Sequence, residues 1–197
     1  MSSPTERDRA VSLARANHRA ALEAARKVSH AFLRSQALAW VARFAPDSSV
    51  KGLIDEAVAA AQESDDPYER IAALAWSLRA ALERGHSREA RPILARALNG
   101  SGAIGNPTRR VDALFLVAQA AWPESALRGD ATAAVVNAAR SPGKKASSVL
   151  RDLALLVAAT GGDASGVVAT ITDPKCRRQA ERHIAERLPF TARPFFW

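Results

Sequence analysis

The chain has a single cysteine, Cys176, among its 197 residues. One thiol cannot form a disulfide within the chain or supply a cysteine metal cluster, so we expect a reducing, cytoplasmic setting. Long apolar runs are also missing. No stretch approaches the roughly 20 residues that span a bilayer, and the first ten residues lack the apolar segment of a signal peptide. The sequence therefore predicts a soluble protein that does not engage a membrane.

Aromatic and β-branched side chains are scarce. Aromatic residues make up 6% of the chain, and alanine dominates an apolar fraction of 48%. Alanine is the strongest helix former, whereas β-branched and aromatic residues favour strands. The composition therefore predicts an all-α fold.

Acidic residues are too few to balance the basic ones, since 20 Asp and Glu face 28 Lys and Arg. The resulting net charge of +8 permits an acidic protein or a nucleic acid as partner. A GC-rich genome also produces an Ala- and Arg-rich composition, and the excess is spread along the chain. The charge alone therefore identifies no partner.

The familiar catalytic patterns are missing too. The chain has no Ser-His-Asp signature, no Gly-rich phosphate loop after a strand and no His-Glu-x-x-His motif. Cys176 and His183 share a helix face, but two ligands are too few for a zinc site. We therefore expect a protein that is not an enzyme and has no catalytic residue, cofactor or metal.

What the chain does contain is a recurring helix opening, made of a capping residue, a proline and a basic residue. The cap accepts hydrogen bonds from free N–H groups of the first turn, and proline is tolerated there because its missing N–H costs nothing. The opening prolines are Pro67, Pro107, Pro142 and Pro174. Residues 30–40 match the copy that starts at Asp66, without the proline. A helix pair that recurs every 32 to 40 residues predicts an α-solenoid, because one pair cannot bury its apolar face alone.

We expect one helical-repeat domain over residues 1–197, a right-handed α-solenoid of about four antiparallel helix pairs with terminal capping helices. Residues 1–29 would be the N-terminal cap, with one long helix over 4–28 or two joined near Asn17. Residues 174–197 would be a capping helix, 174–188, and an aromatic tail. The four pairs of residues 30–173 are predicted at 30–44 and 49–63, 67–84 and 87–99, 107–121 and 130–140, and 143–159 and 163–171. Pro92 predicts a kink or a later start in its helix.

Two known repeat families resemble this pattern. The segment from Gly85 to Ala90, followed by Ala95 and Ala97, resembles the inter-helix Gly and second-helix Ala positions of tetratricopeptide repeats. HEAT-like repeats often begin a helix with Asp-Pro, as this chain does at Asp66. Either resemblance implies stacked helix pairs with a concave surface that binds a partner, and tetratricopeptide repeats line that surface with the first helix of each pair.

The repeat frame places Trp40 and Trp76 at one position, each followed three residues later by an arginine, Arg43 or Arg79. One hypothesis is a groove of aromatic platforms flanked by guanidinium groups, and the other is that both tryptophans belong to the core. The candidate binding residues in this frame are Trp40, Arg43, Trp76, Arg79, Asp112, Gln119 and Arg151.

Basic and aromatic residues raise three further alternatives. The basic residue of each opening (Arg34, Arg70, Arg110, Lys145, Arg177) would form a ladder, which either has a functional role or pairs with carboxylates of the preceding loop, such as Asp65. Lys175, Arg177, Arg178 and Arg182 form a basic patch, which is either a solvated face or a phosphate contact. The tail residues Phe190, Phe195, Phe196 and Trp197 either cap the last helix pair or mediate dimer exchange or partner docking.

We therefore expect a non-enzymatic module that binds a protein or peptide of acidic character on its concave face. The alternative is a nucleic-acid-binding helical-repeat protein, including a HEAT-like DNA glycosylase. A glycosylase would need an aromatic side chain and a carboxylate projecting together. Phe44 and Ala80 stand one turn after the two tryptophans, which argues against it.

Overall fold

The computed structural model describes residues 4–140, 144–188, 190 and 195. These residues form eleven α-helices and one short 3₁₀ helix, and no strand is found among them. The all-α prediction is confirmed. The helices are α1 Pro4–Leu13, α2 His18–Arg26, α3 Ala31–Ala42, α4 Asp47–Gln62, α5 Pro67–Glu83, α6 Ser87–Gly100, η1 Ser101–Ala103, α7 Pro107–Ala121, α8 Ser125–Ala138, α9 Lys144–Ala159, α10 Ser165–Ala169 and α11 Pro174–Ala185.

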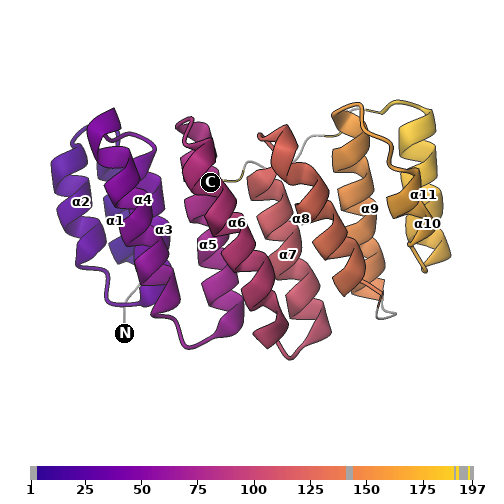
Figure 1. The fold of residues 1–197 in the computed structure, drawn as a ribbon, viewed down its shortest axis with the longest axis horizontal. Coiled ribbons are helices and arrows are strands. Elements are labelled where there is room, and N and C mark those ends of the chain that lie inside the picture. The colour runs from indigo at the N-terminus through magenta and orange to yellow at the C-terminus, as the bar shows by residue number, and fades with distance from the viewer. Residues whose placement is uncertain (1–3, 141–143, 189, 191–194, 196–197) are drawn as a thin grey trace.

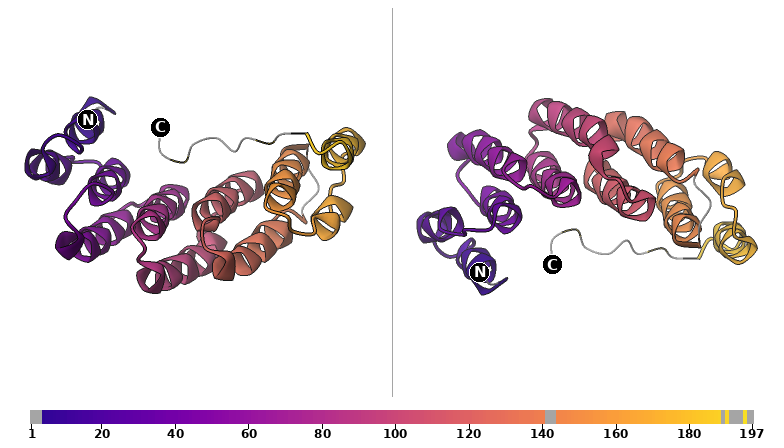
Figure 2. Two further views of the ribbon diagram at one scale, coloured as in Figure 1. Left: turned by 90° about the horizontal axis from the view of Figure 1, so that it is seen from above. Right: turned by 90° about the horizontal axis from the view of Figure 1, so that it is seen from below.

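The helices lie side by side along the molecule, and each packs against the next in the chain (Figure 1). Alternate helices also pack on each other, with α3 against α5, α5 against α7 and α9 against α11. Figure 2 shows the result as two rows that follow a shallow arc. The odd-numbered helices form an inner row on the concave side, and the even-numbered helices form an outer row. The first helix of each predicted pair therefore faces the concave side.

The core runs along the whole arc between the two rows. Leu38, Ile54, Leu74 and Leu78 are fully buried, and many alanines around them let neighbouring helix backbones approach closely. The central helix α5 buries side chains on nearly all its faces, because α3, α4, α6 and α7 surround it. Its inward-facing residues are therefore fixed by packing on several sides.

The cap-proline openings begin helices where the sequence predicts them. Asp66 accepts a hydrogen bond from the N–H of Tyr68 at 2.7 Å, and Asn106 accepts one from Arg109 at 3.1 Å. Asp173 accepts one from Cys176 at 2.8 Å. The helices α5, α7 and α11 accordingly start at their prolines. The opening at residues 141–143 lies outside the described residues.

The N-terminal segment forms two helices rather than one. Asn17 ends the first and caps the second, since its side chain accepts a hydrogen bond from the N–H of Ala20 at 3.0 Å. Pro92 lies inside α6, which begins at Ser87, so the prediction of a later start was wrong. The missing N–H of Pro92 costs one helical hydrogen bond, and the packing of α6 on α5 outweighs that loss.

Three predicted boundaries in the C-terminal half were also wrong. The helix α8 begins at Ser125 and not at 130, because Glu124 caps it and Gly129 lies within the helix. The helix α10 has five residues in place of the nine expected. The helix α11 ends at Ala185 and not at 188, because Arg187 adopts a left-handed conformation with φ of 49°.

Candidate functional site

Trp40 of α3 and Trp76 of α5 lie side by side on the inner row. Their ring centroids are 6.5 Å apart with the ring planes at 39°, because equivalent positions of adjacent repeats meet where α3 packs on α5. Phe44 extends the surface, with its centroid 6.5 Å from that of Trp40. Trp76 is only 4% exposed, whereas Trp40 and Phe44 are partly exposed. Trp76 is therefore buried like a core residue, whereas Trp40 is partly exposed and can offer a ring to a partner.

The two arginines that follow the tryptophans share one carboxylate. The Nε of Arg43 lies 2.6 Å from one oxygen of Glu83, and the Nε of Arg79 lies 2.7 Å from the other. The guanidinium of Arg43 also lies over the rings of Trp40, at 4.8 Å, and of Phe44, at 5.4 Å. Hydrogen bonds and ring contacts therefore hold both cations in a defined orientation. We refer to Trp40, Arg43, Phe44, Trp76, Arg79 and Glu83 as the inner cluster.

A third cation stands beside the inner cluster. The guanidinium of Arg15, from the turn between α1 and α2, lies 5.1 Å from the ring centroid of Phe44. Arg43 and Arg79 thus share the carboxylate of Glu83, while Arg15 approaches the same cluster over the ring of Phe44. Because both Arg43 and Glu83 are three-quarters buried or more, their charges are only partly screened by water. The cluster is an apolar aromatic surface with an excess of positive charge.

Phe195 packs onto the inner cluster from the far end of the chain. Its ring lies 5.6 Å from that of Trp76, with the planes at 61°, and the guanidinium of Arg79 lies 5.9 Å from its centroid. Phe195 is 7% exposed although it belongs to no helix. This is an edge-to-face contact of the kind that aromatic pairs prefer.

The tail prediction holds for one described residue and not for the other. Phe190 lies over the last helix, 6.4 Å from the ring of His183, as a cap would. Phe195 lies over α5 in the middle of the molecule, against the ring of Trp76 and the guanidinium of Arg79. Phe196 and Trp197 lie outside the described residues.

The other predicted binding residues lie in neighbouring positions of the inner row. The backbone oxygen of Gln119 accepts a hydrogen bond from Arg79 at 3.4 Å, which joins α7 to the inner cluster. Asp112 pairs with Lys145 at 3.6 Å. Arg151 donates to Asp152 at 2.9 and 2.7 Å and to Gln179 at 3.2 Å. The structure thus brings together Trp40, Arg43, Trp76 and Arg79, and gives Asp112 and Arg151 separate partners.

The ladder of basic residues binds backbone carbonyl groups, not the loop carboxylates that the sequence suggested. Arg70 donates to the carbonyl oxygen of Ser64 at 2.8 Å, six residues earlier. The same six-residue contact recurs at four other helix openings, from Arg34 to Val28, Arg110 to Ile104, Arg128 to Trp122 and Arg177 to Ile171. Each arginine is the fourth residue of its helix and turns back over the loop that leads into it. A carboxylate of the preceding loop, such as Asp65, is therefore not the partner of the ladder arginines Arg34, Arg70, Arg110 and Arg177. Two ladder residues do pair with carboxylates elsewhere, Arg34 with Glu63 and Lys145 with Asp112.

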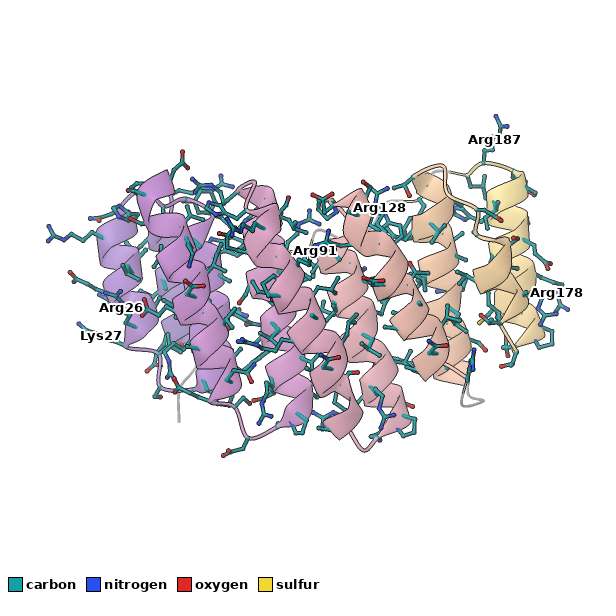
Figure 3. All side chains as sticks on the ribbon, viewed as in Figure 1. Arg26, Lys27, Arg91, Arg128, Arg178 and Arg187 are labelled. Atoms are coloured by element: carbon teal, nitrogen blue, oxygen red, sulfur yellow. The ribbon has the colours of Figure 1, made fainter. Side chains whose placement is uncertain are left out.

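The four residues of the basic patch at α11 have different surroundings. Arg177 holds the loop before α11, while Lys175, Arg178 and Arg182 are exposed. Figure 3 shows labelled basic side chains of the outer face, from Arg26 near α2 to Arg187 near α11, spread along the molecule. The positive charge visible in this view is therefore distributed rather than gathered in one place.

Sequence reasoning did not assign Phe44, Glu83 or Phe195 to the site. Glu83 lies seven residues after Trp76 and four after Arg79, a spacing that places all three on one helix face, so the signal was present. Phe195 gave no such signal, because nothing local links the tail to α5. Glu83 is also the carboxylate near the tryptophans that a glycosylase would need, but both of its oxygens are bound by arginines.

Neither metal ligands nor a membrane segment emerges from the part of the chain that the structure describes. No group of three His, Cys, Asp or Glu side chains there could hold a metal ion. No helix there combines the length and apolarity needed to cross a bilayer. The thiol of Cys176 is buried, and burial raises its pKa, which makes it less reactive.

The three comparisons of this chain with known proteins found no match. No protein-family model matches the chain, and no curated protein or solved structure matches it either. The resemblance to tetratricopeptide or HEAT-like repeats therefore stays a prediction from the sequence, and the function has to be argued from the inner cluster itself.

Proposed function

We propose that the protein is a non-enzymatic binding module that takes up a segment of another protein on its concave side. The repeat frame and the two rows of helices also lead us to propose a right-handed α-solenoid of about four helix pairs, TPR-like or HEAT-like. The observation that carries the functional proposal is the inner cluster on the concave side, where two tryptophan rings have centroids 6.5 Å apart and Glu83 orients the guanidinium groups of Arg43 and Arg79.

The chemistry of the cluster indicates what its partner would carry. The rings of Trp40 and Phe44 are partly exposed and offer an apolar surface. Arg15, Arg43 and Arg79 outnumber the carboxylate of Glu83, so a carboxylate of the partner would gain a charge-assisted hydrogen bond there. A peptide stretch with an aromatic side chain next to acidic ones fits both properties.

Nucleic acid is the less favoured partner, because the cations of the inner row are largely engaged. Glu83 binds Arg43 and Arg79, and Asp152 binds Arg151. The inner row therefore keeps only a small excess of positive charge, which suits one peptide carboxylate better than a run of phosphates. Lesion-processing chemistry is also disfavoured, because both oxygens of Glu83 accept hydrogen bonds from arginines and neither is left facing a substrate.

Selection of a random peptide library on the immobilised full-length protein tests this proposal. We expect enriched peptides that combine aromatic and acidic residues. Their affinity should fall about tenfold or more in the double variant Arg43→Gln and Arg79→Gln, since about 1.4 kcal/mol of binding free energy corresponds to a factor of ten. A matched control, Arg178→Gln and Arg182→Gln, removes the same charge from the exposed face of α11 and should leave the affinity unchanged.

Two results would contradict the proposal. One is a set of selected peptides that bind the inner-cluster variant as well as the wild type while both retain full helicity. The other is tight binding to duplex DNA that weakens steeply as salt rises, which would favour the nucleic-acid alternative.

A further inference from the structure

The contact of Phe195 with the inner cluster resembles that of a bound ligand more than that of a core residue. It belongs to no helix, yet 93% of its surface is removed from solvent, in keeping with its exposed fraction of 7%. Its ring meets the edge of Trp76 at 5.6 Å and the guanidinium of Arg79 at 5.9 Å, both on α5. The side chain of Phe195, which lies outside the helices, is therefore seated in the middle of the concave side.

The seat does not depend on Phe195 for its shape. Trp76 lies on the side of α5 that packs against α3, and its ring centroid is 6.5 Å from that of Trp40. Arg79 is held by Glu83, which also binds Arg43. These contacts all lie within α3, α5 and the turn after α3, so the seat remains formed when the tail leaves it.

We propose that the concave site recognises an aromatic side chain of a partner's segment and that Phe195 occupies this site as an intramolecular competitor. This inference rests on the binding function proposed above and names the anchor that the partner provides. A partner must displace Phe195 before it can bind, so its apparent association constant equals the intrinsic one multiplied by the fraction of molecules in which the seat is free. Tethering maintains a high local concentration of the competitor. Only a segment whose intrinsic affinity is high enough to displace Phe195 therefore binds.

The probe that tests this competition is a fluorescein-labelled synthetic peptide with the sequence of residues 189–197. Its binding to full-length wild type, Phe195→Ala and Phe190→Ala is measured by fluorescence anisotropy. The Phe190→Ala variant is the matched control, because it removes the same ring from the same tail at a position that packs on His183. We expect the probe to bind Phe195→Ala about tenfold or more tighter than the wild type, and Phe190→Ala like the wild type. Adding Arg79→Gln to Phe195→Ala should weaken binding again.

Equal affinity of the probe for wild type and Phe195→Ala would overturn the competition, and the peptide selection above would still decide the binding function separately. Failure of the probe to bind any variant would overturn the aromatic anchor. A wild-type dimer that Phe195→Ala converts to monomer in sedimentation would show exchange between two copies and contradict an intramolecular contact. Should Phe195→Ala lose helicity, Phe195→Leu removes the ring while keeping apolar bulk and answers the same question.

Discussion

At the scale of single residues, several arginines donate hydrogen bonds to backbone oxygens. Arg84 donates to the carbonyl groups of Ala42, Arg43 and Ala45 at 2.8 to 3.0 Å and so satisfies the C-terminal end of α3 from a neighbouring repeat. That end carries free carbonyl groups and the negative pole of the helix dipole, both of which favour a cation. Part of the basic composition is therefore explained by the architecture without any partner.

The contact between Arg70 and Ser64 allows a direct test of this role. Replacing Arg70 by Met keeps the apolar stem but removes donors at 2.8 and 3.3 Å from the Ser64 carbonyl. We expect a loss of about 1 to 3 kcal/mol in the free energy of unfolding, because a partly buried acceptor loses its charged donor. Urea unfolding measures it. The control Arg178→Met, at an exposed position of α11, should change stability by no more than about 0.5 kcal/mol. Equal effects of the two substitutions would rule out the carbonyl contact as the cause.

At the scale of helices, starts were predictable where local chemistry decides them, whereas packing and backbone conformation moved some other boundaries. Asp66-Pro67 and Asp173-Pro174 begin α5 and α11 as expected, because capping and proline geometry involve adjacent residues alone. The predicted start at residue 130 places Gly129 outside the helix, yet Gly129 lies inside α8, because packing outweighs the modest helix penalty of glycine. The early end of α11 depends on the left-handed backbone conformation of Arg187, and the residue types around Arg187 do not predict that conformation.

Two glycines predict opposite outcomes for one substitution. Gly85, between α5 and α6, has φ of 75°, and no atom lies within 4 Å of an added Cβ, so backbone strain alone opposes Gly85→Ala. We expect a loss of about 1 to 2 kcal/mol in the free energy of unfolding. Gly52 lies within α4 with equal space around it, so Gly52→Ala should gain up to about 1 kcal/mol. Thermal unfolding of both variants gives the signs, and the same sign for both would contradict this reading of the two positions.

At the scale of the whole molecule, the arc joins segments that lie far apart in the sequence. The repeat frame could place Trp40 beside Trp76, because equivalent positions of stacked helices meet. It could not place Phe195, since the tail belongs to no repeat and its position depends on the concave side being already formed. The two tryptophans and two arginines of the candidate site could thus be predicted from the sequence. Glu83 and Phe195 were identified as part of it only from the three-dimensional arrangement.

The most direct measurement uses the indole N–H signals of the four tryptophans as local reporters. The ¹⁵N-labelled Phe195→Ala protein is titrated with the unlabelled peptide of residues 189–197 and followed by NMR. We expect the signals of Trp40 and Trp76 to shift as the peptide binds, while Trp122 stays in place because it lies at the end of α7 under Arg128, away from the inner cluster. A peptide that binds and moves Trp122 instead, or leaves Trp40 and Trp76 unmoved, would contradict a recognition site on the concave side.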